Sequence, residues 1–143
     1  MVKDCIFCDI LSGKLPVTKL YEDEKILIFM DIQPINSGHL LIIPKEHKEL
    51  ITELDDNLVA HMFKLAQKMN FAVRDSGVKC EGVNYFLADG ESAGQEVFHV
   101  HVHVIPRFKD DGFGFKFPEG YENKPSRENL ETVAEKIKKV LKN

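Results

Sequence analysis

The sequence predicts an α+β domain built on a mostly antiparallel sheet. Several short apolar segments bounded by turn residues predict strands, and only two segments have the periodicity of long helices. The strands follow one another without regular intervening helices, which favours antiparallel pairing over a doubly wound fold. The 143 residues are 43% hydrophobic and 29% charged, a composition typical of one globular domain with a sizeable core. We therefore treat residues 1–143 as a single domain.

Two apolar segments predict a pair of neighbouring strands in the first third of the chain. Residues 26–31 form the first strand, and residues 39–43 form the second, which Pro44 ends. The connection at 33–38 carries Pro, Asn, Ser and Gly, which are typical turn residues. Because the connection is short, we expect the two strands to pair antiparallel.

The segments outside residues 97–105 predict two helices and one further strand. Residues 55–75 have helical periodicity, with Asp55 or Asp56 as the cap and Ser76-Gly77 at the end. Residues 82–89 predict a third main strand, and residues 108–124 are rich in Gly, Phe, Asp and Pro and are expected to be irregular. Ser126 caps a final helix whose apolar face consists of Leu130, Val133, Ile137 and Val140.

Three histidines alternate with valines in the segment 97–105, which predicts a strand. His99, His101 and His103 share one face, spaced about 6.5–7 Å apart, while Val100, Val102 and Val104 face a core. Near neutral pH, imidazoles can transfer protons, attack an electrophile or hold a metal. The row is therefore the main candidate for a functional site.

Two kinds of chemistry compete for the histidine row. His101 or His103 can act on phosphorus as nucleophile, acid or base, or a His-x-His pair can hold a catalytic metal. The small, polar loop 90–95 precedes the row and can bring backbone N–H groups close to an anion. No acidic residue lies on the histidine face of the predicted strand; the nearest acid, Glu96, has the opposite parity. These features favour phosphate chemistry.

Composition excludes several classes of function. The net charge of −4 and the lack of a basic run argue against binding to nucleic acid. No segment approaches the roughly 18 apolar residues of a membrane span, and the first residues have no apolar signal core. Three cysteines do not make a disulfide framework, so we expect a reducing, cytoplasmic setting.

Cys5 and Cys8 form a C-x-x-C pair at the start of the chain. Such a pair alone leaves both redox and zinc functions open. Redox pairs usually follow a strand in a βαβ unit, whereas this one precedes every predicted strand, which favours zinc.

The histidine segment and its flanks resemble a known family. Residues 94–107 read Gly-Gln-Glu-Val-Phe-His-Val-His-Val-His-Val-Ile-Pro-Arg, which is similar to the motif of the histidine triad nucleotide-binding proteins. The start, Cys5-Ile6-Phe7-Cys8-Asp9-Ile10, resembles that of zinc-bearing bacterial members, and residues 31–34 and 38–47 also match. The resemblance covers residues 5–107, whereas the loop and helix at 108–143 carry no family marker.

The resemblance implies a fold, an assembly and a metal. The fold is the histidine triad fold, a mostly antiparallel sheet of five strands with a long central helix and a C-terminal helix. The usual assembly is a homodimer. The resemblance implies structural zinc and no organic cofactor, with magnesium accompanying a polyphosphate substrate; the zinc ligands would be Cys5, Cys8, His47 and His99.

The resemblance also implies an activity. His101 would attack the α-phosphorus of a purine nucleoside phosphoramidate or dinucleoside polyphosphate, and water would hydrolyse the covalent nucleotidyl-histidine. His103 would contact the phosphate or the leaving group, and His39 would steady the row. The implied substrate contacts are Asp31 to the ribose, Ile32 to the base, and Gly94 and Gln95 to phosphate oxygens.

Two positions depart from the family pattern. Glu96 stands where many relatives have Ser or Thr, and an ionised carboxylate cannot donate a hydrogen bond as a hydroxyl does. Ala88 stands where several relatives have Asn or Gln. Two alternatives remain open from the sequence: a nucleotide-binding sensor or scaffold with incidental hydrolysis, and a metal-dependent His-x-His enzyme.

Overall fold

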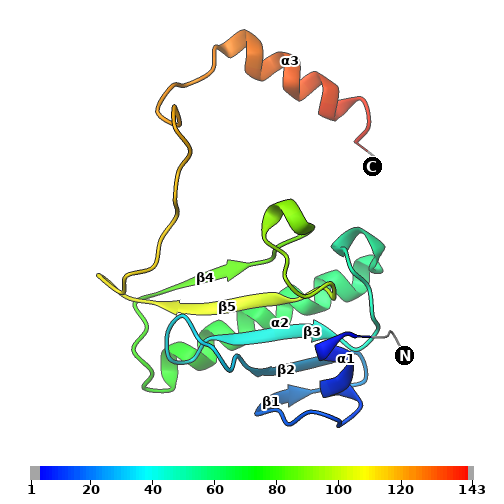
Figure 1. Ribbon diagram of the computed structural model, residues 1–143. Helices are drawn as coiled ribbons and strands as arrows, with labels where there is room; N and C mark the ends of the chain where they lie inside the picture. Colours follow the sequence, from blue (N-terminus) through cyan, green and yellow to red (C-terminus); the bar gives the residue numbers. More distant parts are fainter. Residues whose placement is uncertain (1–3, 142–143) are drawn as a thin grey trace. The chain divides into compact units, whose positions relative to one another are not determined.

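The computed structural model describes residues 4–141, within which one five-stranded sheet has every neighbouring pair antiparallel (Figure 1). The strand order is β1-β2-β3-β5-β4. The helices and strands are α1 (Ile6–Leu11), β1 (Lys19–Glu22), β2 (Ile26–Met30), β3 (Leu40–Pro44), α2 (Asp56–Asp75), β4 (Gly82–Phe86), β5 (Val102–Arg107) and α3 (Arg127–Lys138), with short 3-10 helices at Ile51–Glu53 and Glu91–Ala93. The predicted α+β class is confirmed.

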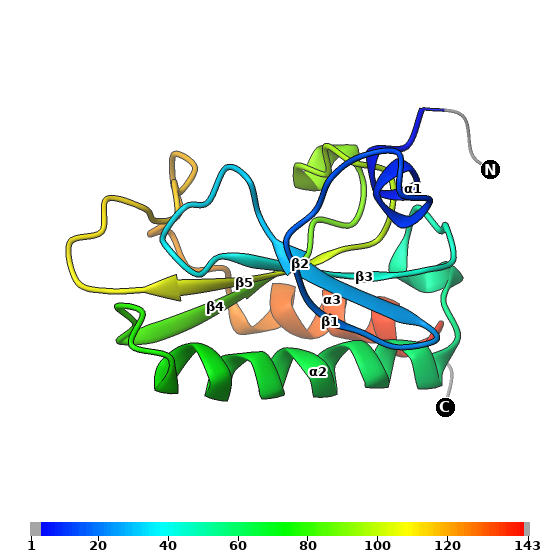
Figure 2. The same cartoon turned by 90° about the horizontal axis from the view of Figure 1, so that it is seen from below.

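The central strands β2 and β3 are buried on both faces, which explains their continuous apolar sequences. Helix α2 runs along one face of the sheet and α1 lies on the other (Figure 2). Against α2 lie Ile28, Ile42 and Val104, and against α1 lie Phe29 and Leu41. Because successive strand residues point to opposite faces, one strand supplies both clusters.

Helix α2 has the predicted bounds. The side chain of Asp55 accepts a hydrogen bond from the backbone N–H of Asn57 at 2.9 Å and so caps the first turn. The helix ends at Ser76, before Gly77 in the left-handed region at φ +85°. Its buried stripe consists of Leu58, Met62, Leu65, Ala66 and Val73.

The predicted histidine strand 97–105 is wrong in its first half, because β5 begins only at Val102. The backbone N–H of His99 donates to the carbonyl of Val97 at 2.9 Å, a local turn rather than a ladder bond. The N–H of Val100 donates to Lys48 at 2.8 Å, outside the sheet. The bend places His101 immediately before the strand, while the predicted burial of the three alternating valines is confirmed.

Besides β5, two strands differ from what the sequence predicts. The edge strand β1 is not predicted, because its Lys-Leu-Tyr-Glu sequence is mostly exposed and lacks a clear apolar alternation. Strand β4 ends at Phe86 rather than at Asp89, and the carboxylate of Asp89 instead accepts the N–H of Ile51 at 2.7 Å.

The loop between β2 and β3 packs closely on the end of β5. Gly38 has φ +90°, and a Cβ there would lie 3.0 Å from Cγ1 of Val78 and 3.2 Å from Cγ of Pro106. A larger residue would therefore meet both backbone strain and crowding. This close approach fixes the loop that carries Asp31, Ile32 and His39 toward the histidines.

The chain divides into two compact units, one ending at Gly112 and the other starting at Phe113. The second unit contains α3, whose predicted cap is confirmed because the Ser126 side chain accepts the N–H of Asn129 at 3.1 Å. No residue of α3 is buried. Among residues 4–141, no helix is long and apolar enough to cross a membrane.

Candidate functional site

Three histidine side chains, those of His39, His101 and His103, gather on the α1 face of the sheet. His103 in β5 pairs with Leu41 in β3, whose side chain belongs to the cluster under α1. The ring centroids of His101 and His103 are 5.0 Å apart, and the ring of Phe7 in α1 lies 5.1 Å from that of His101. His39, just before β3, completes the group, so the site is assembled from three segments distant in sequence.

The backbone fixes the tautomer of His101. Its Nδ1 lies 2.7 Å from the carbonyl oxygen of His99 and donates to it, because a carbonyl can only accept. In the neutral ring, Nε2 then carries the lone pair. His101 is only 7% exposed, and this burial lowers the pKa of its ring. The ring therefore stays neutral near neutral pH. A neutral imidazole with an oriented lone pair is a nucleophile.

A second chain of hydrogen bonds fixes His39 and His103. The N–H of Ile35 donates to Nδ1 of His39 at 3.0 Å, so the proton of the neutral His39 ring resides on Nε2. That Nε2 lies 2.8 Å from Nδ1 of His103 and donates to it. His103 therefore carries its own proton on Nε2. Burial, then the neighbouring His101 and His39, lower the pKa of His103 to about 4.

An acid and an exposed apolar side chain lie beside these rings. Asp31 follows β2, and its Oδ2 is 3.5 Å from Nε2 of His39 while its Oδ1 accepts the N–H of Gln33 at 2.8 Å. Ile32 is 95% exposed, which is unusual for an isoleucine and leaves its side chain available for a ligand.

Asp31 joins two histidines in a carboxylate–imidazole cluster that the sequence does not indicate. Ligand atoms of Asp31, His39 and His103 all lie within 4.8 Å of one another. The histidine face of β5 carries no acid, and the carboxylate comes instead from Asp31, the residue that follows β2. The Ile35 amide disfavours a metal here, because it keeps a proton rather than a lone pair on Nε2 of His39.

The loop before the histidines is held by Gln95. Its Oε1 accepts the N–H of Gly90 at 2.8 Å, and its Nε2 donates to the carbonyls of Glu49 and Val97 at 2.8 and 3.2 Å. Gln95 is 4% exposed and its amide hydrogens are engaged by these carbonyls, so the amide shapes the loop, and its expected contact with a phosphate stays a prediction. The N–H of Gly94 likewise donates within the loop, to Glu91 at 2.9 Å.

The two departures from the family pattern lie in different environments. Glu96 is exposed, so its carboxylate is solvated rather than buried among the histidines. Ala88 is 5% exposed and belongs to the packed interior.

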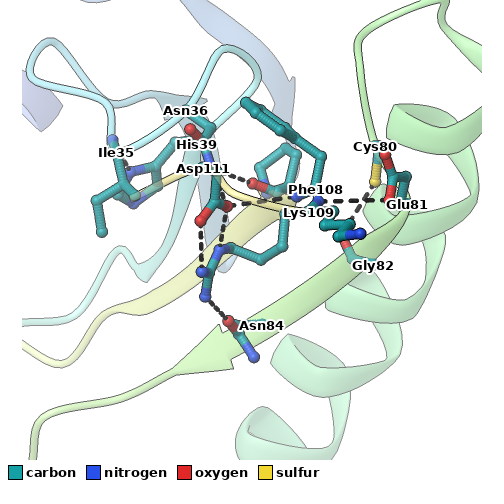
Figure 3. A network of polar contacts seen from close by, with 12 residues as sticks. Ile35, Asn36, His39, Cys80, Glu81, Gly82, Asn84, Phe108, Lys109 and Asp111 are labelled. Atoms are coloured by element: carbon teal, nitrogen blue, oxygen red, sulfur yellow. Dashed lines mark hydrogen bonds and ion pairs between the residues drawn. The ribbon is translucent and has the colours of Figure 1, made fainter. Parts of the chain in front are cut away.

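A partly buried ion pair anchors the loop that carries His39. Arg107 donates to both carboxylate oxygens of Asp111, from Nε at 2.6 Å and from Nη2 at 2.8 Å. Asn36 donates from Nδ2 to Asp111 at 2.8 Å and to the carbonyl of Pro106 at 2.9 Å. Figure 3 shows Asn36 and Asp111 side by side, with Ile35 and His39 in the same loop. No sequence signal indicates this network, because Asn36 is 70 residues from Pro106 and 75 from Asp111.

A Cys/His cluster lies at the other end of the row. Sγ of Cys5 is 3.5 Å from Nδ1 of His99, and Sγ of Cys8 is 3.4 Å from Nδ1 of His47. The four ligand atoms lie within 4.8 Å of one another, so the structure brings the predicted set together. His99 donates from Nε2 to the carbonyl of Pro44 at 2.8 Å, which leaves Nδ1 free for a metal.

The chemistry of this donor set fits zinc. Two sulfurs and two imidazole nitrogens match a closed tetrahedral site. Burial, then the contact with Cys5, raise the pKa of the Cys8 thiol to about 11, so without a cation this thiol stays protonated. A bound divalent ion reverses this balance by stabilising the thiolates.

Comparisons with known proteins identify similar chains. A family model described as "HIT domain" matches residues 12–110. An uncharacterized HIT-like protein of Borreliella burgdorferi is 50% identical over 114 residues, covering 79% of this chain and 82% of that protein. A crystal structure of a HIT family protein from Bacillus anthracis has a TM-score of 0.88 at 38% identity, covering 99% of this chain and 100% of the other.

Two relatives with assigned activities and one metal-bound structure are also similar. The adenylylsulfatase HINT3 of Arabidopsis thaliana is 40% identical, covering 76% of this chain and 54% of that protein. The adenosine 5'-monophosphoramidase hnt1 of Schizosaccharomyces pombe is 37% identical, covering 96% of this chain and 98% of that protein. A zinc-bound histidine triad family protein from Mycobacterium smegmatis has a TM-score of 0.74 at 36% identity, covering 96% of this chain and 98% of the other.

Proposed function

Because the chain belongs to the HIT domain family, we propose that it is a nucleotide hydrolase that acts at the α-phosphorus through a covalent nucleotidyl-His101 intermediate. The observation that carries the proposal is the hydrogen bond from Nδ1 of His101 to the carbonyl of His99 at 2.7 Å. It presents the lone pair of Nε2 without any proton having to be removed first.

The reaction proceeds in two displacements. Nε2 of His101 forms a bond to the α-phosphorus while the bond from phosphorus to the leaving group breaks, and the leaving group takes the electron pair. The adduct ring is cationic, with its Nδ1 proton held by the His99 carbonyl. Water then attacks the same phosphorus, the P–N bond breaks, and the electron pair returns to Nε2 as the water proton passes to solvent. His101 is thereby regenerated in its starting tautomer.

The proposed substrates are purine nucleoside phosphoramidates or dinucleoside polyphosphates. The two relatives with assigned activities, a monophosphoramidase and an adenylylsulfatase, support hydrolysis of adenylyl compounds in general. The exposed Ile32 offers an apolar surface to a base, and Asp31 offers acceptor oxygens to ribose hydroxyls.

The other site residues support the reacting phosphate. His103 donates from Nε2 to a phosphate or leaving-group oxygen, and His39 holds His103 in that orientation. Gly94 and Gln95 shape the loop that precedes the histidines, and Nε2–H of His103 is the proposed donor that stabilises developing charge.

Zinc is proposed as a structural ion held by Cys5, Cys8, His47 and His99. When bound, it ties the N-terminal segment to the start of the histidine row and supplies no chemistry at phosphorus. The zinc-bound relative supports this assignment. The proposed mechanism uses no organic cofactor, and magnesium would enter only as the counterion of a polyphosphate substrate.

A homodimer in the cytoplasm is the proposed setting. The apolar face of α3 supports association, because Leu130, Val133 and Ile137 are 47%, 53% and 59% exposed. The three cysteines are free thiols, which suits a reducing compartment. Sedimentation equilibrium of the full chain is expected to give twice the monomer mass, and a monomer at micromolar concentration would exclude the dimer.

Steady-state kinetics on adenylyl substrates tests the proposed function. We expect turnover of an adenosine phosphoramidate, an adenylyl sulfate or a diadenosine polyphosphate by the wild type, and its loss in both His101→Ala and His101→Gly. Tight binding with negligible turnover would instead indicate a sensor. Turnover that a chelator abolishes, while the histidine variants retain it, would indicate a metal-dependent enzyme.

A further inference from the structure

We infer that Asp111 is a positioning residue of the candidate site and that it couples this site to the second unit of the chain, which begins at Phe113. The carboxylate of Asp111 holds the β2–β3 loop, while its backbone lies one residue before Gly112, the last residue of the first unit. The inference rests on the proposed function and names a regulation of that same site. A change in the direction of the chain at this junction should alter turnover, although no residue there touches a reacting atom.

The carboxylate of Asp111 joins the β2–β3 loop to two strands. Its Oδ2 accepts hydrogen bonds from Nε of Arg107 at 2.6 Å and from Nδ2 of Asn36 at 2.8 Å. The same oxygen accepts the N–H of Phe108 at 3.3 Å, and Oδ1 accepts Nη2 of Arg107 at 2.8 Å. Arg107 also donates from Nη1 to the side chain of Asn84 in β4. Asp111 therefore ties the loop to β5 directly and to β4 through Arg107.

Burial of this carboxylate favours a single arrangement of the network. The Asp111 side chain is only 3% exposed, and that of Arg107 is 21% exposed. A buried carboxylate that loses a donor is left with an unsatisfied charge, so its hydrogen bonds are costly to break. A displacement of Asp111 is therefore expected to move Asn36 with it.

The backbone turn that carries Asp111 has an unusual conformation on both sides of this residue. Asp110 has φ +61° and Gly112 has φ +80°, so Asp111 lies between two residues in the left-handed region. The N–H of Asp111 donates to the carbonyl of Phe108 at 3.3 Å and closes the turn. Because a Cβ makes left-handed backbone strained, glycine is the residue that holds the φ of position 112 at least cost. The direction of the Asp111 side chain thus depends on the chain direction at Gly112.

Asn36 carries a displacement of Asp111 to the histidines. Its side chain also donates to the carbonyl of Pro106 at 2.9 Å, so it is held between the turn and the end of β5. It follows Ile35, whose N–H donates to Nδ1 of His39 at 3.0 Å (Figure 3). A shift of this loop therefore moves His39, and a misplacement of about 1 Å can lower a catalysed rate about 100-fold.

Replacement of the carboxylate tests the positioning role. Asp111→Asn keeps the shape of the side chain but sets an NH₂ group against the donors of Arg107 and Asn36. At a temperature at which the variant is folded, its kcat for an adenosine phosphoramidate should fall about 10-fold or more. Asp110→Asn is the matched control, because it removes the neighbouring exposed carboxylate and suits left-handed backbone. It should keep kcat within about twofold of wild type.

A double variant shows whether Asp111 acts through Asn36. If it does, Asp111→Asn combined with Asn36→Ala should lower kcat by no more than the larger single effect. Two independent effects on the rate would multiply, to about 100-fold, and would overturn this route. Two purely structural effects would lower the stability and leave kcat of the folded protein unchanged, which would overturn it as well.

Two glycines with the same backbone conformation test the coupling to the second unit. Gly112 has φ +80° and Gly120 has φ +78°. A Cβ would meet nothing within 4 Å at Gly112 and only Nδ2 of Asn123, at 3.5 Å, at Gly120, so alanine introduces comparable strain and no crowding at either position.

The expected results differ between the two glycines. Gly112→Ala should lower kcat about threefold or more and shift the ¹H–¹⁵N signal of the Ile35 amide. Gly112→Asn, which tolerates left-handed backbone better than alanine, should restore both. Gly120→Ala should change neither.

The outcomes separate this inference from the proposed function. Wild-type kcat in a folded Asp111→Asn protein would overturn the positioning role, and equal effects of Gly112→Ala and Gly120→Ala would overturn the coupling. If Asp111→Asn does not fold, the glycine pair and the Ile35 signal still decide. Absence of turnover of every adenylyl substrate by the wild type would overturn the proposed function, whereas the Ile35 signal would still report the coupling.

Discussion

The carbonyl oxygen of His99 accepts a hydrogen bond from Nδ1 of His101 at 2.7 Å, while the ring of the same His99 lies in the Cys/His cluster. One residue therefore joins the proposed metal-ligand set to the orientation of the proposed nucleophile. The ring is held on its other side by the Pro44 carbonyl at 2.8 Å. The contacts of the His99 ring with Cys5 and with the Pro44 carbonyl hold the residue whose carbonyl orients His101. Loss of the cluster should therefore lower catalysis even though no reacting group is changed.

Removing one thiol of the cluster should remove the metal. We expect Cys8→Ser to contain less than about 0.2 zinc per chain and to lose about 3 kcal/mol or more of unfolding free energy, because a structural zinc site contributes directly to folding. Its kcat should fall more than its KM rises, since the His99 carbonyl loses its support. Metal analysis, thermal unfolding and kinetics measure these effects.

Cys80→Ser is the matched control for the zinc variant. The Cys80 thiol donates to the Gly82 carbonyl at 3.2 Å, away from the cluster. Its replacement should leave zinc content and kcat unchanged. A Cys8→Ser protein with full zinc and wild-type stability would contradict the proposed ligand set.

Ile32 should contribute to binding and not to folding. The residue is 95% exposed, so Ile32→Ala should leave the melting temperature within about 1 °C of wild type. If its side chain covers a base in the complex, truncation should raise KM about 10-fold at unchanged kcat, the effect of losing uniform binding. Ile32→Leu should restore KM. A lowered melting temperature with unchanged KM would instead make Ile32 a packing residue.

Asn36 should stabilise the fold and position the histidines. Its amide donates to Asp111 and to Pro106, so Asn36→Ala should cost about 1–2 kcal/mol of unfolding free energy. Because the loop also carries Ile35 and His39, kcat should fall by about 10-fold or more. Asn70→Ala, which removes an exposed hydrogen bond to Tyr85, is the control and should change neither quantity appreciably.

The buried histidines make stability depend on pH. Burial lowers the pKa of His39 and lowers that of His103 to about 4, from 6.5. The unfolded chain therefore binds protons more strongly than the folded one, so stability rises with pH through this range. We expect unfolding free energy to be complete above pH 7 and to decline between pH 6.5 and about 4.

Denaturant titrations at graded pH measure this decline. His103→Asn removes one of the responsible groups, so its stability should fall less steeply over the same interval. A wild-type stability that is constant from pH 7 to 5 would show that these rings are not neutral in the folded protein.

Elements held by local interactions were predictable from the sequence, whereas those held by contacts distant in sequence were not. Helix α2 and strands β2 and β3 were predictable, because their apolar periodicity and caps lie within the segments themselves. The bend at residues 97–101 was not, because it depends on the Val100 N–H bonding to Lys48, some fifty residues earlier.

Within the candidate site, the histidines were predictable from the sequence and their hydrogen-bond partners were not. The alternating histidines indicate the chemistry, but only the structure shows that the Ile35 amide sets the tautomer of His39. The amide of Gln95, the expected phosphate donor, is engaged by the carbonyls of Glu49 and Val97, and only the fold brings Glu49 to it.

Trapping the covalent adduct tests the central claim most directly. The wild type would be mixed with an adenylyl substrate, quenched in alkali within milliseconds, digested and mapped by mass spectrometry. We predict an adenylyl group on His101, formed and consumed at rates consistent with turnover and absent from His101→Ala. Turnover without any adduct, or an adduct on His99, His103 or His39 instead, would contradict the assignment of His101 as the nucleophile.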